Sequence, residues 1–177
     1  MADQIALKPV DIPVALQLAD VADPTYEQLG DVLGISPSTA HGAVQRLRAA
    51  GLVQDEHLRV NKNALFEFLE HGVRYAFPAA LQASARGIPT AFSGPALSTE
   101  IVSDDSVVWA AVDGAAYGPT ITPLLSHVSH LPIRHPALYR LLTLVDAVRI
   151  GRSRERALAV NLLRSALGVK ERMAVYG

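Results

Sequence analysis

The chain has 177 residues, of which half are hydrophobic and 19% are charged, a balance typical of a folded globular protein with one or two small domains. It contains no cysteine, which excludes disulfides, thiolate metal sites and cysteine nucleophiles and fits a cytoplasmic location. The longest apolar windows are interrupted by charged residues, glycine and proline, and the N-terminus lacks the pattern of a secretion signal. We therefore expect neither a membrane span nor export.

The charge is unevenly distributed along the chain. Residues 1–75 contain six Lys/Arg and ten Asp/Glu, a net charge of −4, whereas residues 134–172 contain nine Lys/Arg and three Asp/Glu, a net charge of +6. A negative N-terminal part opposes long-range attraction to a polyanion such as DNA.

The first helices are predicted from apolar periodicity and from their capping residues. One helix is expected from about residue 11 to 21. A second begins after Thr25, whose spacing to Gln28 is that of a capping box, and ends at Gly34 in the left-handed conformation. Ser36 caps a third helix, Pro37 occupies its first position, and the helix stops before residue 51.

A short hairpin and a fourth helix follow. Residues 52–53 and 58–60 are predicted to pair as two short strands. The fourth helix covers "ALFEFLEHG", with either Asn61 or Asn63 as its cap. This order of elements is that of a winged helix.

After about residue 72, the helical pattern gives way to short β-prone pieces. The pieces "GVRYAFPA", "GIPTAF", "VVWAAV" and "TITPLL" predict three or four short strands or extended segments, and Pro89 and Pro95 make their own stretch poorly suited to a central strand. Helical periodicity returns from Pro136. Gly151 ends that helix, and Ser153 is expected to cap the last one.

The predicted fold class is α+β and mainly α. Residues 1–72 are expected to form an N-terminal winged helix-turn-helix domain. Residues 73–177 form a mixed α+β domain for oligomerisation or sensing, with a small mixed β segment and a C-terminal helical pair.

The most specific stretch is "TYEQLGDVLGISPSTAHGAVQRLRAAGLV". It combines a capped second helix, "LGIS" at the turn, "PST" at the start of the third helix and "AAGLV" before the hairpin. It resembles the helix-turn-helix of bacterial winged-helix transcriptional regulators of the MarR and related groups, over about residues 10–72. The resemblance implies a sequence-specific double-stranded DNA-binding regulator, by default a repressor and a homodimer.

The third helix has the pattern that a DNA-recognition helix needs. The major groove is about 12 Å wide and accepts one helix, which must pack on a second helix and leave its other side exposed. Ala40, Val44 and Leu47 recur at helical spacing and are expected to face the core. The candidate DNA-contacting residues, most of them on the opposite side, are Ser36, Ser38, Thr39, His41, Gly42, Gln45, Arg46 and, on the hairpin, Arg59.

Each of these residue types has a reason to contact DNA. Hydroxyl groups and the helix N-terminus suit phosphate oxygens. Gln45 can bond to adenine through two hydrogen bonds, and Arg46 to guanine or to phosphate. Gly42 allows close approach of the helix backbone, although it costs about 1 kcal/mol of helix stability relative to alanine.

Two features keep a different function open. The hairpin tip carries Asp55 and Glu56, which phosphate would repel, and the N-terminal part is acidic. A helical hairpin used for packing, or a winged helix that binds protein, therefore remains an alternative. In that case the chain is a protein-interaction adaptor or an antitoxin-like partner, which holds another protein through its basic C-terminal helices and the segment "RYAFPA…RGIPTAF".

The remaining motifs indicate neither a metal site nor a catalytic centre. His127, His130 and His135 are interrupted by Pro132 and have no carboxylate nearby, so a metal site is disfavoured. Trp109 and Tyr117 are expected in the core or beside a small apolar pocket. We predict no enzyme and no cofactor, and leave open a protein or small-molecule effector.

The arginines at 149, 152, 154 and 156 allow two interpretations. They could contact phosphate or an acidic partner, or they could pair within the chain with Asp146 and Glu155. Local pairing is favoured, because both acids lie within a few residues of the arginines.

Overall fold

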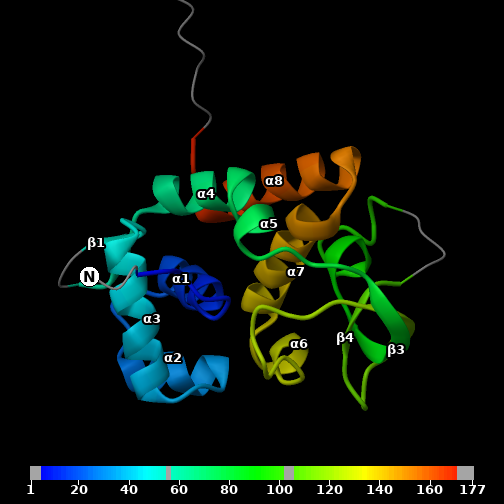
Figure 1. Cartoon of the computed structure of the whole chain (residues 1–177), viewed down its shortest axis with the longest axis horizontal. Coiled ribbons are helices and arrows are strands. Elements are labelled where there is room, and N and C mark those ends of the chain that lie inside the picture. Colours follow the sequence, from blue (N-terminus) through cyan, green and yellow to red (C-terminus); the bar gives the residue numbers. More distant parts are fainter. Residues whose placement is uncertain (1–4, 55–56, 102–105, 171–177) are drawn as a thin grey trace, which may run out of the picture.

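Two helices lie in the middle of the computed structural model, which describes residues 5–54, 57–101 and 106–170. They are α1 (Asp11–Asp20) and α7 (Pro136–Ile150), and both bury most of their residues. A helix that is apolar on every side needs packing partners on every side. Accordingly, α1 packs against the neighbouring N-terminal helices and against α7, and α7 also contacts elements of the C-terminal half (Figure 1).

The N-terminal half follows the predicted order of helix, helix, helix, hairpin and helix. Thr25 and Gln28 form the capping box in both directions, with N···O distances of 3.1 and 2.8 Å, and Gly34 has a φ of 64°. Asn61, not Asn63, caps the fourth helix by accepting from the Ala64 amide. After α1, the elements are α2 (Tyr26–Leu33), α3 (Pro37–Ala49), β1 (Val53–Gln54), β2 (Arg59–Val60) and α4 (Lys62–His71).

The C-terminal half combines a small sheet with helices. Strand β3 pairs antiparallel with both β4 and β5, and the last two touch through one parallel bridge between Val108 and Thr120. The mainly helical α+β class is thereby confirmed. Besides α7, the elements are α5 (Val73–Ala76), β3 (Gln82–Pro89), the 3-10 turn η1 (Ala91–Ser93), β4 (Val108–Ala110), β5 (Ala116–Thr120), α6 (Leu131–Arg134) and α8 (Ser153–Leu167).

Several local expectations in this half are wrong. The piece "GVRYAFPA" contains the helical turn α5, because the amides of Tyr75 and Ala76 both donate to the Gly72 carbonyl. Of the piece "TITPLL", only the first residue, Thr120, belongs to a strand, as the last residue of β5. Ser153 does not cap α8: Arg152 precedes the helix, and its amide donates to the Glu155 carboxylate at 2.8 Å.

Pro89 lies in the strand that pairs with both others, contrary to the expectation that this stretch suits a central strand poorly. It is the last residue of β3, where a missing amide hydrogen does little harm to the ladder. The Pro89 carbonyl accepts a hydrogen bond from the Tyr139 hydroxyl at 2.6 Å.

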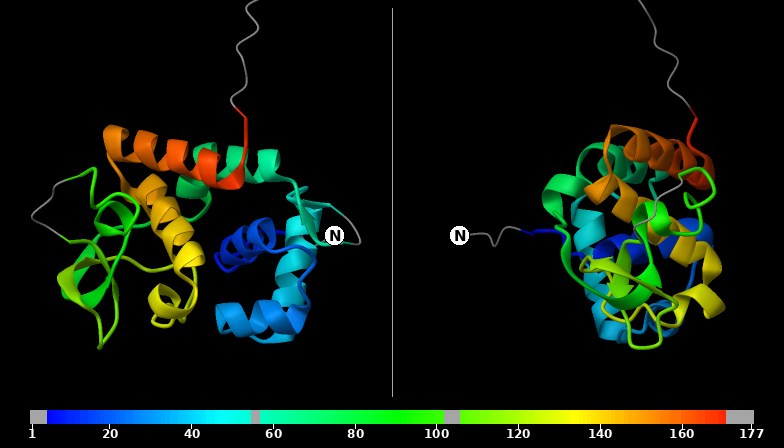
Figure 2. Two further views of the ribbon diagram at one scale, coloured as in Figure 1. Left: turned by 180° about the vertical axis from the view of Figure 1, so that it is seen from behind. Right: turned by 90° about the vertical axis from the view of Figure 1, so that its right-hand side faces the viewer.

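The two halves share one hydrophobic core. Its buried side chains run without interruption from α1 through α7 to α8, so the proposed boundary at residue 72 stays a prediction. A polar contact also joins the halves: His130, just before α6, donates from Nε2 to the Val32 carbonyl at 2.8 Å. Figure 2 shows α2 and α6 at the same end of the molecule. Within the described ranges, no helix has the length and apolarity needed to cross a bilayer.

A buried ion pair joins α7 to the sheet. The Asp146 carboxylate accepts from the Arg149 guanidinium at 2.7 Å, from Trp109 Nε1 at 2.6 Å and from the Thr90 hydroxyl at 2.8 Å. Arg149 also donates to the Phe77 carbonyl at 2.8 Å. Burial raises the pKa of Asp146, while the arginine and the neutral donors act in the opposite direction. The local pairing expected for Arg149 is confirmed.

Replacing Asp146 by alanine should lower the free energy of unfolding by about 3–5 kcal/mol, because Arg149 would stay buried without its counter-charge. Asp31 on α2 is exposed, so the matched variant Asp31→Ala should change stability by less than about 0.5 kcal/mol. Urea unfolding followed by circular dichroism measures both. Equal effects of the two substitutions would contradict a central role for the pair.

Tyr139 provides a test at high pH. Burial raises the pKa of its hydroxyl from 10.0 to about 12. The folded state therefore holds this proton more tightly than the unfolded chain, and its contribution is complete below about pH 10 and is lost as the pH rises towards 12. The fall in stability from about pH 9 to about pH 11 should be smaller in Tyr139→Phe than in the wild type. Parallel urea titrations that show identical slopes would refute this assignment.

Candidate nucleic-acid interface

Helix α3 lies on the outer side of the N-terminal half. Its inner side rests on α1 and α2 through four fully buried residues, Ala40, Ala43, Val44 and Leu47. Figures 1 and 2 show α3 at the margin of the molecule, away from α7 and the strands of the C-terminal half. The inward orientation predicted for Ala40, Val44 and Leu47 is confirmed.

Most of the predicted DNA-contacting side chains are exposed. This holds on α3 and its cap for Ser36, Ser38, Thr39, His41 and Gln45, and on β2 for Arg59. At the start of the helix, the Ser36 hydroxyl accepts from the Thr39 amide at 3.1 Å and lies 2.9 Å from the Thr39 hydroxyl. These two hydroxyls are thus partly engaged with each other, whereas the structure gives Ser38 no such local bond.

Arg46 is not directed outward, and this expectation is wrong. Its guanidinium turns towards α1 and makes two hydrogen bonds to Asp11, from Nε at 2.9 Å and from Nη2 at 2.6 Å. The Arg46 side chain is 19% exposed and the Asp11 carboxylate is fully buried. These hydrogen bonds raise the pKa of Arg46, while partial desolvation opposes them. A buried carboxylate is stable only with a cationic partner, and Arg46 provides the counter-charge for Asp11.

Gly42 has a corresponding structural role. A Cβ atom at this position would lie 3.3 Å from Arg46 Nη1, which is one helical turn further along α3. The missing side chain therefore leaves room for the guanidinium to lie along the helix towards Asp11. The i, i+4 spacing of Gly42 and Arg46 places these two residues one above the other on α3. Helical periodicity alone could not show that the buried Asp11 lies beside Arg46.

Three side chains form a connected edge on the outer part of the candidate interface. The Tyr26 and His41 rings meet edge to face, with centroids 5.1 Å apart and planes at 79°. Gln45 Nε2 lies 3.4 Å from His41 Nε2. Tyr26 was not identified from the sequence, because it belongs to α2 and only the packing of α2 against α3 brings it beside His41.

Two basic side chains lie on the hairpin side of the interface. Exposed Arg59 and Lys62 border, together with His57, a hollow between the hairpin and the segment that follows α1. One carboxylate, Asp23, lines the same hollow. The acidic tip residues Asp55 and Glu56 lie outside the described residues.

The other residues singled out in the sequence do not join this interface. Trp109 is buried in the core, whereas Tyr117 is exposed. His130 contacts Val32, and its ring meets His135 edge to face at 5.7 Å. Burial first, then the neighbouring His130 and Arg134, lowers the pKa of His135. In the described part of the chain, no cluster of three or more candidate ligands could hold a metal.

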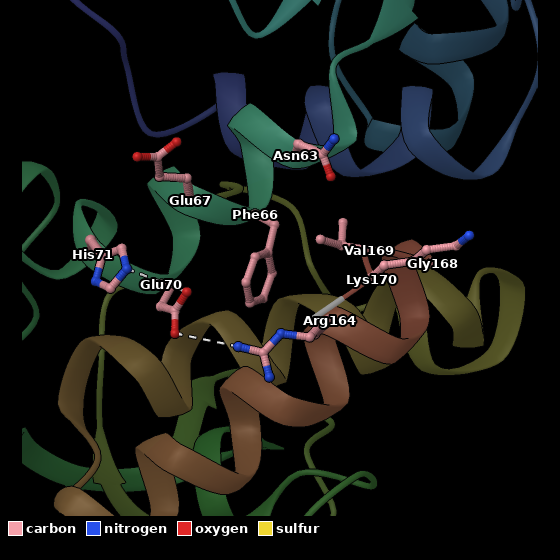
Figure 3. Close-up of a pocket in the computed structure, with 9 residues that line it drawn as sticks. All are labelled: Asn63, Phe66, Glu67, Glu70, His71, Arg164, Gly168, Val169 and Lys170. Carbon is pink, nitrogen blue, oxygen red and sulfur yellow. Dashed lines mark ion pairs between the residues drawn. The ribbon is translucent and has the colours of Figure 1, made fainter. Parts of the chain in front are cut away.

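A second hollow of about 570 Å³ lies between α4 and the end of α8 (Figure 3). Its floor is formed by Phe66, with the Arg164 guanidinium 4.9 Å from the ring centroid. Glu70 lies 3.6 Å from Arg164 and 3.3 Å from His71. Glu67 and Glu70 line it from α4, whereas Arg164 and Lys170 line it from α8 and the residues after α8, so the opposite charges face each other across the hollow. No motif in the sequence predicted this hollow.

Comparison of the chain with protein-family models, curated proteins and solved structures finds no match.

The Asp11–Arg46 pair predicts a large effect of a single substitution. Arg46→Ala should lower the free energy of unfolding by about 3 kcal/mol, because it leaves the Asp11 carboxylate buried without a counter-charge. The matched variant Arg59→Ala removes an exposed arginine and should change stability by less than about 0.5 kcal/mol. Thermal and urea unfolding measure the difference, and similar stabilities of the two variants would show that the pair is unimportant.

Proposed function

We propose that the chain is a sequence-specific double-stranded DNA-binding transcriptional regulator, by default a repressor, and that α3 enters the major groove. The observation that supports this most directly is the two-sided character of α3. One side is fully buried on α1 and α2, and the other exposes Ser38, His41 and Gln45. A helix that rests on a second helix and leaves a polar side open fits the width and chemistry of the groove.

The arrangement of the head and the hairpin supports the same proposal. The order of elements from α1 to α4 matches that of a winged helix, in which the hairpin is the wing. Arg59 and Lys62 lie on the wing side and would contact phosphate, while the start of α3 offers hydroxyl groups and backbone amides. Phosphate contacts position the protein and base contacts give it specificity.

The charge distribution predicts weak non-specific binding. The N-terminal part is acidic overall, and Arg46 is occupied by Asp11. With two basic contacts, from Arg59 and Lys62, the slope of log K against log salt should be about −2 for each head. Affinity would then depend on base contacts more than on charge, and screening confines the effect of distant acids to about 8 Å at physiological salt.

The C-terminal half would bring two such heads together. It exposes several large apolar side chains, namely Tyr75, Leu81, Val112, Tyr117 and Ile133. Aromatic residues such as Tyr75 and Tyr117 are enriched at protein contacts. We infer a cytoplasmic homodimer that binds a two-fold site, and a protein or small-molecule effector that acts through the same half.

The same exposed residues support the second candidate, an adaptor or antitoxin-like protein. Tyr75 and Leu81 lie in or next to the segment "RYAFPA…RGIPTAF", which was expected to hold another protein. The two candidates differ in α3: its polar side is free to contact DNA in the first and is covered by a partner or by the C-terminal half in the second. The open side of α3 favours the regulator.

A gel-shift assay of the full-length protein with the DNA upstream of its own coding region tests the proposal. The double variant Ser38→Ala/Gln45→Ala should lose specific affinity by about 5- to 150-fold for each base contact removed. The matched variant Gln82→Ala/Ser84→Ala removes the same residue types from exposed positions of β3 and should bind like the wild type.

A salt titration of the same complex distinguishes the candidates. A specific complex that survives random competitor DNA and has a shallow salt slope agrees with the regulator. Absence of any preference for the upstream DNA, or equal affinities of the two double variants, would instead favour the protein-binding role.

A further inference from the structure

We propose that Gln45 is the base-selecting residue of α3, that it selects adenine, and that His41 and Tyr26 hold its amide in position. This inference rests on the proposed DNA binding and specifies which bases the head recognises. It follows from three observations: the occupied state of Arg46, the contact between Gln45 and His41, and the aromatic contact between His41 and Tyr26.

The first observation excludes Arg46, the other long polar side chain predicted to contact bases, from base recognition. Arginine most often recognises guanine, through two parallel hydrogen bonds from its guanidinium. In Arg46, Nε and Nη2 already donate to Asp11. Turning the side chain towards DNA would leave a fully buried carboxylate without its counter-charge, which is strongly unfavourable. Arg46 therefore contributes to stability and not to guanine recognition.

The second observation concerns the orientation of the Gln45 amide. Nε2 of Gln45 carries two hydrogens and can donate one of them to His41 Nε2, which lies 3.4 Å away. The histidine nitrogen accepts when the imidazole is neutral and carries its proton on Nδ1. The second hydrogen of Nε2 and the Oε1 atom then stay available on the exposed side of the helix.

These two remaining groups match one base. In the major groove, adenine presents N7 as an acceptor and the N6 amino group as a donor. Gln45 Nε2–H can donate to N7 while Oε1 accepts from N6–H. Guanine presents two acceptors at the corresponding positions, so it offers no donor for Oε1. The hydroxyl of Ser38 can bond to several bases or to phosphate and discriminates less.

The third observation explains how an exposed histidine is held. The edge-to-face contact with Tyr26 restricts the His41 ring, with centroids 5.1 Å apart. Tyr26 is only partly exposed, and it lies in the first turn of α2, which the capping box of Thr25 and Gln28 orders. His41 and Tyr26 are thus positioning residues: they act through Gln45 and need not contact the base.

Selection from a pool of random duplexes, followed by sequencing of the bound DNA, tests the assignment with the full-length protein. The wild type should enrich a motif with one invariant adenine in each half-site. Gln45→Glu replaces the amide donor by an acceptor and should change that adenine to cytosine, whose N4 amino group is a donor. The other positions of the motif should stay the same.

A second variant tests the positioning role. His41→Phe keeps a ring against Tyr26 but removes the nitrogen that accepts from Gln45. It should reduce discrimination for adenine at the same position by about 5-fold or more, with the remaining motif retained. Thermal unfolding should be unchanged in both variants, because both side chains are exposed.

The outcomes separate this inference from the proposed function. If the wild type enriches no motif, the proposed DNA binding fails, and this inference fails with it. If the wild type enriches a motif that Gln45→Glu leaves unchanged, the chain binds DNA specifically but Gln45 does not select the base. A loss of discrimination equally spread over all positions in His41→Phe would show that His41 does not act through Gln45.

Discussion

The ion pair between Asp11 and Arg46 joins α3 to the first turn of α1 and keeps the guanidinium on the inner side of α3. Asp11 is fully buried in the first turn of α1 and receives two hydrogen bonds from the guanidinium and a third from the Lys8 amide. A buried carboxylate without such partners would be strongly destabilising. Together with the buried inner side of α3, this ion pair holds the rotation of α3 on α1 and leaves Ser38, His41 and Gln45 on the open side. Gly42 contributes by leaving space for the guanidinium.

The C-terminal half is organised by a similar interaction. The Asp146 carboxylate on α7 accepts hydrogen bonds from Arg149, Thr90 and Trp109. Thr90 directly follows β3 and Trp109 lies in β4, so this carboxylate connects α7 to both strands. In both halves the aspartate belongs to a helix that is buried on nearly all sides. Apolar packing is not directional, whereas these hydrogen bonds have narrow distances and angles, so they specify how each central helix is rotated.

The sequence predicted those parts of the fold that depend on local chemistry. The capping box at Thr25, the left-handed Gly34 and the cap at Ser36 follow from interactions within a few residues, and the structure confirms them. The helix over 73–76 was missed, because its residue types are β-prone, whereas the structure pairs the Tyr75 and Ala76 amides with the Gly72 carbonyl and buries Val73. The inner side of α3 was predictable from its period.

The candidate interface was only partly predictable for the same reason. Exposure of Ser38 and Gln45 follows from helical spacing. The orientation of Arg46 depends on a carboxylate 35 residues earlier in the chain, and the position of Tyr26 beside His41 depends on how α2 packs against α3. Long side chains can turn to either side of a helix, so their direction is decided by the partners that the fold supplies.

The burial of α1 from two directions has a consequence for how such a protein can evolve. An excised N-terminal segment would expose to water the side of α1 that packs on α7, and it would lose the bond from His130 to the end of α2. Gene fusion or recombination at residue 72 would therefore transfer an incomplete core. A viable transplant would have to carry α7 as well, so the two halves are expected to be inherited as one unit.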